Sequence, residues 1–261
     1  MVKQQKAIVF CIFLPTTTMS QPLHIVVPCY NPFEGWEVQL AQHFKNIQAQ
    51  LPQYAIEAVL VNDASQTGIN NTQIEYLKKE LPLFSYISYT QNQGKGYALR
   101  EGIKTLNSGL ILYTDIDFPY EYDSMLKILQ SLEAGSDIAV GTRDDGYYEN
   151  TPTKRKWISK IVRFVFRTVF RLPITDTQCG LKGFNQKGKQ VFLKTTINRF
   201  LFDMEFIALA SKNKSVVMKP VHVELRKNVV FSRMNLKILT SEFWNFIKIL
   251  RIVRRHVPDN G

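Results

Sequence analysis

The feature that most constrains this chain is a regular alternation between short apolar runs and longer segments with helical spacing of apolar residues. The apolar runs are too short for helices and rich in β-forming residues, so we expect them to be buried strands. Strands that alternate with helices form a parallel sheet built from right-handed βαβ units. The sequence therefore predicts an α/β fold with a mostly parallel sheet flanked by helices. The expected strands are Leu23–Val27, Ile56–Val61, Phe84–Tyr89, Leu110–Thr114 and Asp137–Thr142, and the helices between them are Trp36–Leu51, Asn70–Leu81, Tyr97–Leu106 and Asp123–Ala134.

Beyond Arg143 the pattern changes. A polar loop at Asp144–Thr153 precedes the basic amphipathic segment Lys154–Arg171, and Leu236–His256 has the same character. Between them we expect strands at Leu181–Phe184 and Val216–Leu225 and helices at Gln186–Leu193 and Met204–Ala210, with Asp123 and Asp203 as helix N-caps. The expected organisation is an N-terminal extension over residues 1–18, one domain over residues 19–234 and a C-terminal basic amphipathic helix over residues 235–261, with a weak membrane anchor as the alternative for the extension.

Composition limits the partners. The 261 residues carry a formal net charge of +11, which indicates an anionic partner such as a phosphorylated substrate, a membrane surface or nucleic acid. Nucleic acid is disfavoured, because the basic residues share helices with aromatic residues instead of forming a stacking platform. The cysteines have neither disulfide nor zinc spacing, which suits a reducing cytosol. The two basic helices predict contact with a membrane surface, or else they are surface helices that cover the core.

Polar clusters follow the expected strands where each strand ends. Parallel strands bring these ends to one edge of the sheet, where open α/β sheets bind ligands. The most specific cluster is Asp115 and Asp117 directly after a buried run: paired carboxylates supply hard oxygen ligands for Mg²⁺ or Mn²⁺, and such an ion could hold a diphosphate. The alternative is a pair of solvated turn carboxylates. The other clusters are Tyr30-Asn31, Asn62-Asp63, Asn92–Lys95 and Arg143.

Taken in order, these motifs resemble family 2 glycosyltransferases of the polyprenyl-phosphate (dolichyl-phosphate) glucosyltransferase and mannosyltransferase type, from about Leu23 to about Arg251. The resemblance implies a GT-A fold, a nucleotide-sugar donor and a polyprenyl-phosphate acceptor. The Gly-Lys-Gly and Asp-Thr-Gln-Cys-Gly runs favour the glucosyl branch. The motifs are Pro28-Cys29-Tyr30-Asn31, Val61-Asn62-Asp63-Ala64-Ser65, Asn92-Gln93-Gly94-Lys95-Gly96, Asp115-Ile116-Asp117, Gly141-Thr142-Arg143 and Asp176-Thr177-Gln178-Cys179-Gly180.

On the donor side the resemblance implies that Asp63 accepts hydrogen bonds from uracil or ribose and that Lys95 approaches the nucleotide or its phosphates. Asp115 would face the ribose and the metal, and Asp117 would bind the metal. The structural alternatives are a turn-capping role for Asp63 and a turn shaped only by the two glycines beside Lys95. The residues expected to line the nucleotide pocket are Pro28, Tyr30 and Asn31.

On the acceptor side, a polyprenyl phosphate is already ionised at pH 7 and needs cations more than a general base. By resemblance Arg143, Arg155 and Ser159 would hold this phosphate, and Lys182 and Arg233 would touch the diphosphate. The alternative for Arg155 is a solvated charge on a basic helix. Asp176 would either orient the arginines or act as general base towards a sugar hydroxyl. Glu205 fits the aromatic-Asp-x-Glu helix start of the family, and helix capping is the alternative.

Two positions depart from the family pattern. Pro32 stands where many members have Glu, and Pro119 stands where the mannosyl branch often has a metal-binding Gln. The favoured expectation is transfer of glucose from a UDP-sugar to a polyprenyl phosphate by an inverting, metal-dependent enzyme. We expect this enzyme to be cytoplasmic and peripheral on the inner face of the membrane, where a membrane-anchoring partner protein could bind it. The alternatives are transfer to a saccharide hydroxyl with Asp176 as general base, and a catalytically inactive sugar-nucleotide-binding subunit.

Overall fold

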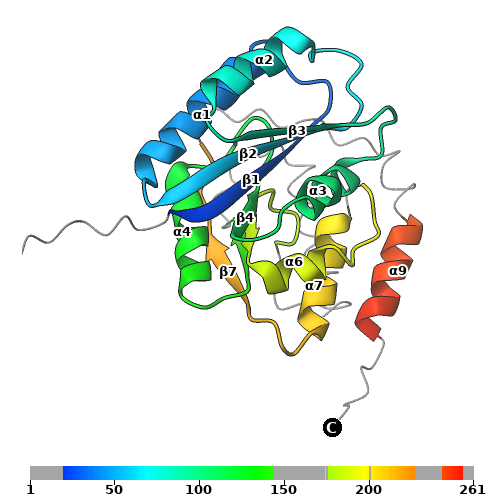
Figure 1. Cartoon of the computed structure of the whole chain (residues 1–261). Coiled ribbons are helices and arrows are strands. Elements are labelled where there is room, and N and C mark those ends of the chain that lie inside the picture. The colour runs from blue at the N-terminus through cyan, green and yellow to red at the C-terminus, as the bar shows by residue number, and fades with distance from the viewer. Residues whose placement is uncertain (1–19, 144–173, 175, 200, 227–242, 255–261) are drawn as a thin grey trace, which may run out of the picture.

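The computed structural model describes residues 20–143, 174, 176–199, 201–226 and 243–254. Across these ranges a seven-stranded sheet has the strand order β3-β2-β1-β4-β6-β5-β7 (Figure 1). Neighbouring strands are parallel except where β6 pairs with β4 and with β5. The predicted mostly parallel α/β sheet is therefore confirmed. The strands are β1 Gln21–Cys29, β2 Tyr54–Asn62, β3 Phe84–Ser88, β4 Leu110–Tyr113, β5 Ile138–Thr142, β6 Lys182–Phe184 and β7 Met218–His222.

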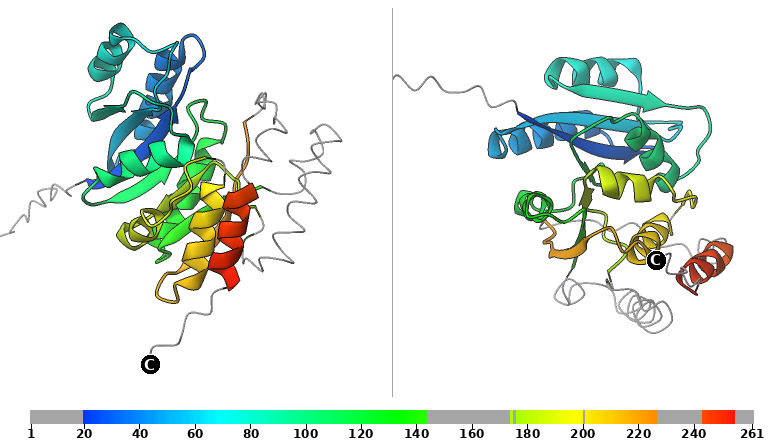
Figure 2. Two further views of the ribbon diagram at one scale, coloured as in Figure 1. Left: turned by 90° about the vertical axis from the view of Figure 1, so that its right-hand side faces the viewer. Right: turned by 60° about the horizontal axis from the view of Figure 1, so that its bottom comes forward.

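Helices cover both faces of the sheet. α1, α2 and α4 lie on one face, and α3, α6, α7 and α9 lie on the other, with α9 alongside α7 (Figure 2). None of the helices in the described ranges combines the length and apolarity needed to cross a bilayer. Their bounds are α1 Trp36–Gln50, α2 Asn71–Glu80, α3 Lys95–Lys104, α4 Tyr122–Glu133, α6 Gln186–Phe192, α7 Phe202–Lys212 and α9 Phe243–Arg254.

The alternation of side chains along β1 explains the two helical layers. Leu23, Ile25 and Val27 point into a core shared with α1, α2 and α4, whereas Val26 points into a second core shared with α3, α6, α7 and α9. Successive residues of a strand face opposite sides of the sheet, so a strand that is apolar throughout needs cover on both faces. Burying each such side chain contributes about 1.5–3 kcal/mol.

The chain order creates a switch point beside β1. After β1 the chain first builds β2 and β3 on one side and then returns to place β4 on the other side of β1. Ligands of open α/β sheets bind in the crevice outside the strand ends at such a point. Asn31, Ala64 and Phe118, in the loops after β1, β2 and β4, have positive φ values of 46°, 57° and 43°. Non-glycine residues in this region are strained and cluster at functional sites.

Two predicted helix caps are wrong. α4 begins after Glu121 without a side-chain cap, and Asp123 lies inside its first turn. α7 begins after Leu201, and the carboxylate of Asp203 turns instead to Lys182 and Tyr113. The predictions for residues 1–18, 144–153 and 154–171 lie outside the described residues, and of the predicted Leu236–His256 helix the structure describes α9.

Candidate active site

The acidic pair lies at the switch point, directly after β4. The backbone N–H of Phe118 donates to the carbonyl of Asp115 (3.0 Å), which closes a tight turn around Asp117. Asp115 is partly exposed and Asp117 is exposed. Partial desolvation and the nearby charge of Asp115 raise the pKa of Asp117. Two carboxylates that disfavour each other's ionisation are stabilised by a bound cation.

Lys95, at the start of α3, is the nearest cation to this pair among the described contacts. Its Nζ donates to Oδ1 of Asp115 (2.5 Å). Burial disfavours the charged amine, but the carboxylates of Asp115, Asp203 and Asp117 outweigh burial and raise the pKa of Lys95. Lys95 therefore stays charged at neutral pH beside the acidic pair.

The residues of this turn fit a divalent ion in part. Asp115 and Asp117 offer hard oxygen atoms, which Mg²⁺ and Mn²⁺ prefer. Within the described ranges, however, no group of three or more His, Cys, Asp or Glu residues could hold a metal by itself. A divalent ion would therefore take its remaining ligands from water and from phosphate oxygens, as Mg²⁺ usually does.

The glycines beside Lys95 serve close packing. A Cβ on Gly94 would lie 2.7 Å from the carbonyl oxygen of Asn198, and one on Gly96 would lie 2.6 Å from that of Ile197. The N–H groups of Gly96 and Tyr97 donate to the carbonyl of Asn198 (2.7 and 3.2 Å). These two N–H groups in the first turn of α3 are thus occupied by protein and not open to a ligand.

Asp63, after β2, organises the loop between β3 and α3. Its Oδ1 accepts hydrogen bonds from the Tyr89 hydroxyl (2.8 Å) and the Gln93 N–H (2.7 Å), and its Oδ2 accepts from Asn92 Nδ2 (2.9 Å) and the Gly94 N–H (2.8 Å). A carboxylate has about four acceptor sites. Contact with a base or ribose, as predicted, would require one of these bonds to open.

A pocket of about 470 Å³ lies beside this loop, at the ends of β2 and β3. Asn31 helps to shape its rim: its Oδ1 accepts from the N–H groups of Gln66 (2.8 Å) and Thr67 (3.2 Å), and its own N–H donates to the Ser65 hydroxyl (2.9 Å). The pocket lining consists of Asn62, Ala64, Ser65, Gln66, Ser88, Tyr89, Thr90, Gln91 and Asn92.

The predicted pocket residues differ from this lining. Pro28 is buried inside β1, where it pairs in register with Val61, and it is not among the residues that line this pocket. The predicted strand ended at Val27, two residues before the end of β1 at Cys29, because proline usually marks a strand end. Tyr30 is 48% exposed at the tip of the loop after β1. Amide side chains of the β3–α3 loop replace Pro28 in the lining.

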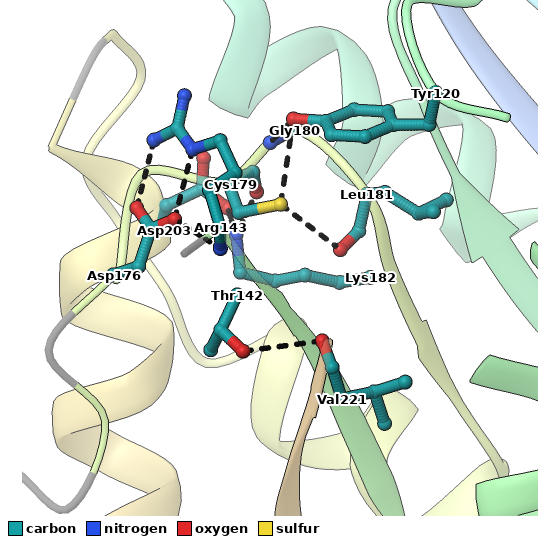
Figure 3. Close-up of polar contacts among 10 residues, drawn as sticks. All are labelled: Tyr120, Thr142, Arg143, Asp176, Cys179, Gly180, Leu181, Lys182, Asp203 and Val221. Carbon is teal, nitrogen blue, oxygen red and sulfur yellow. Dashed lines mark hydrogen bonds and ion pairs between the residues drawn. The ribbon is translucent and has the colours of Figure 1, made fainter. Parts of the chain in front are cut away.

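Arg143 follows β5 and is held by Asp176 (Figure 3). The guanidinium donates through Nε to Oδ2 (2.8 Å) and through a terminal nitrogen to Oδ1 (2.7 Å), and the backbone N–H of Arg143 donates to Oδ2 (2.9 Å). Burial opposes the charge of Arg143, but the bonds to Asp176 outweigh it and raise the arginine pKa. Both oxygens of Asp176 are therefore engaged in orienting Arg143.

The turn that carries Asp176 reaches the acidic pair. Its last residue, Gly180, donates its N–H to the Tyr120 hydroxyl (2.8 Å), and the Cys179 thiol donates to the same oxygen (3.3 Å). A Cβ on Gly180 would lie only 2.5 Å from Oδ2 of Asp115. The turn thus connects Arg143 to Asp115. Tyr120, which the sequence analysis did not single out, anchors this turn (Figure 3).

Lys182 corrects another prediction. The side chain is fully buried, and its Nζ donates to the Cys179 carbonyl (2.5 Å) and to Oδ1 of Asp203 (2.7 Å). The same Asp203 oxygen accepts from the Tyr113 hydroxyl (2.5 Å). Lys182 therefore supports the turn from beneath and cannot touch a diphosphate in this arrangement.

Glu205 is likewise internal. It is 1% exposed and accepts from the N–H groups of Thr196 and Ile197 (2.7 Å each), so it braces a loop rather than capping its helix. The predicted phosphate-binding residues Arg155, Ser159 and Arg233 lie outside the described residues.

The chain has a GT-A fold, which two solved structures share. The structure of mannosyl-3-phosphoglycerate synthase from Rubrobacter xylanophilus superposes with a TM-score of 0.64 at 13% identity, covering 90% of this chain and 74% of that one. Glucosyl-3-phosphoglycerate synthase from Mycobacterium tuberculosis, in complex with Mn²⁺, UDP and phosphoglyceric acid, superposes with a TM-score of 0.62 at 12% identity, covering 92% and 81%.

The family follows from the sequence comparison. The chain belongs to glycosyl transferase family 2, whose profile matches residues 24–192. The dolichyl-phosphate beta-glucosyltransferase of Drosophila melanogaster is 28% identical over 212 residues, which cover 75% of this chain and 64% of that protein. The dolichol-phosphate mannosyltransferase of Pyrococcus furiosus is 29% identical over 206 residues, which cover 77% and 56%. The chain thus spans less than two thirds of the length of these relatives.

Proposed function

We propose that this chain is an inverting glycosyltransferase that moves a hexose, with glucose favoured, from UDP-sugar to a polyprenyl phosphate. The dolichyl-phosphate beta-glucosyltransferases among its relatives support the acceptor class and the glucosyl preference. The observation that carries the proposal is the meeting of an acidic pair and an oriented arginine at one sheet edge. The close approach of Gly180 to Asp115, where a Cβ on the glycine would lie 2.5 Å from Oδ2, joins these two halves.

The donor half consists of the acidic pair, Lys95 and the pocket. Asp115 and Asp117 would hold Mg²⁺ or Mn²⁺, and the ion supplies positive charge for the departing diphosphate. Lys95 adds a fixed positive charge beside them. The amide groups that line the pocket can donate to and accept from the edge of a uracil ring, and we assign the pocket to the base.

The acceptor half centres on Arg143. A phosphate oxygen of the acceptor attacks the anomeric carbon, the bond from that carbon to the diphosphate oxygen breaks, and the configuration inverts. The acceptor carries no proton that must be removed, so an oriented guanidinium suffices to hold it. Asp176 supplies this orientation through two guanidinium bonds. We expect Arg155, Ser159 and Arg233 to complete the phosphate site.

We assign contact with the membrane surface to α9 and to the basic segment 154–171 of the sequence. Trp244 is 74% exposed on α9, which also carries Lys248, Arg251 and Arg254. An exposed Trp among basic residues is typical of helices at a membrane interface. Each Lys or Arg near an anionic surface contributes about 1 kcal/mol. We therefore propose peripheral attachment to the leaflet that presents the acceptor.

The competing functions receive less support. Transfer to a saccharide hydroxyl with Asp176 as base would need a carboxylate oxygen that can accept a proton, and Arg143 occupies both oxygens. An inactive binding subunit would have no need of the acidic pair, whose exposed member Asp117 has a raised pKa.

A donor screen tests the proposal. The purified chain is incubated with Mn²⁺, a short polyprenyl phosphate and radiolabelled UDP-glucose, UDP-galactose, UDP-N-acetylglucosamine or GDP-mannose, and the label is extracted into organic solvent. We expect extractable label from UDP-glucose, and loss of that label with Asp117→Asn or with EDTA. Label that passes only to a water-soluble saccharide would overturn the proposal that the acceptor is a lipid phosphate. The absence of any transfer or donor hydrolysis would overturn the proposal that the chain is an enzyme.

A further inference from the structure

We infer that Arg100 and Glu205 are positioning residues that hold Lys95 against Asp115, through a clasp formed by residues 195–198. This inference rests on the proposed function, in which Lys95 supplies positive charge at the donor site. Both residues are buried, with 7% exposure for Arg100 and 1% for Glu205, and they come from different helices, α3 and α7. A buried charge requires a structural or functional reason, because burial without partners is costly.

Arg100 grips the clasp from α3. One terminal guanidinium nitrogen donates to the Ile197 carbonyl (2.8 Å) and to the Thr195 hydroxyl (3.3 Å), and the other donates to Oδ1 of Asn198. These bonds span the clasp almost from end to end. Because a guanidinium is planar and offers several donors in a fixed geometry, it fixes the orientation of the carbonyl groups as well as their distance.

Glu205 holds the same segment from α7 by accepting hydrogen bonds from the backbone N–H groups of that segment. Its Oε2 accepts from the N–H groups of Thr196 and Ile197 (2.7 Å each), and its Oε1 accepts from the Thr196 hydroxyl (3.0 Å). Lys248 of α9 lies 3.4 Å from Oε1. A positive group thus holds the acceptors of the clasp and a negative group holds its donors, so both ions are compensated by oriented dipoles.

The clasp in turn fixes the first turn of α3. The carbonyl oxygen of Asn198 accepts the N–H groups of Gly96 (2.7 Å) and Tyr97 (3.2 Å). The absence of a side chain on Gly94 and Gly96 allows the two backbones to approach this closely. Lys95 lies between these glycines, which have no side chains to pack beside it. The position of the Lys95 backbone therefore depends on the Asn198 carbonyl, which accepts the N–H group of the neighbouring Gly96.

The final link is the ion pair between Lys95 and Asp115 (2.5 Å). A shift of about 1 Å in the position of a group at a reacting centre can cost about 100-fold in rate. The loss of either buried ion should therefore reach the donor site through Lys95, although neither Arg100 nor Glu205 contacts Asp115 in the structure.

A double-mutant cycle tests this inference. Arg100→Lys and Glu205→Gln are each measured with Lys95 present and in the Lys95→Met background, with kcat and KM for the UDP-sugar as readouts. We expect a loss of about tenfold in kcat/KM when Lys95 is present and of less than about twofold when it is absent, because coupled residues are not additive. Equal losses in both backgrounds would overturn the inference. Should Arg100→Lys fail to fold, Asn198→Ala removes one acceptor of Arg100 at a partly exposed position and enters the same cycle.

A matched control comes from the same helix, α3. Lys104→Met removes an ion pair with Glu101 at a side chain that is 56% exposed, and it should leave kcat/KM unchanged. A second readout does not require turnover: reductive methylation followed by mass spectrometry reports the accessibility of Lys95. Faster methylation of Lys95 in Arg100→Lys, but not in Lys104→Met, supports the clasp even if the wild-type chain transfers no sugar, which would overturn the proposed function alone. Unchanged methylation of Lys95 in a folded Arg100→Lys protein would overturn the clasp.

Discussion

Asp176→Asn separates the orienting role of Asp176 from a role as general base. The carboxylate accepts three hydrogen bonds from Arg143: two at Oδ2 and one at Oδ1. An asparagine oxygen can keep the two bonds at Oδ2, but its NH₂ group then faces the terminal nitrogen of Arg143, so donor meets donor. The side chains of Arg143 and Asp176 are 15% and 7% exposed, so solvent compensates little. Losing one bond between charged groups costs about 1.5–3 kcal/mol.

We therefore expect a modest defect in the acceptor step. A misplaced Arg143 should raise KM for the polyprenyl phosphate and lower kcat/KM by about 10- to 100-fold, which corresponds to about 1.4–2.7 kcal/mol. The KM for the sugar nucleotide should stay unchanged. In the Arg143→Met background the same substitution should cost little more, because the two residues act as one unit.

The assay is initial-rate transfer into extractable lipid over a range of pH, with urea unfolding as the measure of stability. Asp137→Asn is the matched control, because Asp137 is also buried and hydrogen-bonded but precedes β5, at the opposite end of the strand from Arg143. It should lose stability without changing either KM. A loss beyond about 10⁴-fold in kcat, with an unchanged acceptor KM and a lost basic group in the pH profile, would refute the orienting role and indicate a general base.

Three other variants address the supports of the site. Burial and the charge of Arg226 lower the pKa of His43 to about 4, so the unfolded chain binds more protons than the folded chain between about pH 4 and 6.5. The free energy of unfolding should therefore decrease as the pH is lowered from about 6.5 to about 4, by up to about 3 kcal/mol in all. His43→Gln, compared with the exposed His222→Gln, should flatten this profile in urea unfolding, and an unchanged slope would contradict this cause. Lys182→Met leaves the buried Asp203 without its cation and should cost about 3–5 kcal/mol of unfolding free energy, against almost nothing for the exposed Lys187→Met; a cost below about 1 kcal/mol would contradict a stabilising buried ion pair between Lys182 and Asp203. Gly180→Ala puts a Cβ 2.5 Å from Oδ2 of Asp115, so the carboxylate must turn away from Lys95; kcat/KM should fall about tenfold with little change in the melting temperature, and full activity would show that the turn adapts.

The strands and helices were predictable because their signals are local. The apolar run at Leu110 predicts a strand with cover on both faces, and the structure has β4 there, buried throughout. The spacing from Trp36 to Ile47 predicts α1, and those residues are buried. The meeting of polar clusters at one edge was also predictable, because it follows from parallel topology rather than from any single motif.

The partners of the charged residues were not predictable. Lys182 and Asp203 are 21 positions apart, and Asp63 contacts a loop 26 to 31 positions later. Nothing local distinguishes a lysine that faces solvent from one that faces a buried carboxylate, because the choice depends on which helix covers that face of the sheet. Motif spacing therefore indicated that Lys182 belongs near the site but not on which side of the turn it lies.

The acidic residues near this edge of the sheet differ in how many hydrogen bonds they already accept from the protein. This difference distinguishes their roles more clearly than their position in the sequence does. Asp63, Asp176 and Glu205 each accept at least three bonds from the protein, and each fixes a loop that borders the site. Asp117 is exposed, and its pKa is raised by desolvation and by Asp115. A carboxylate that is already satisfied gains little from a ligand, whereas one held beside a like charge gains most from a cation. On this ground we expect the acceptance of a divalent ion to depend on Asp117, while the neighbouring acids determine the position of the groups around it.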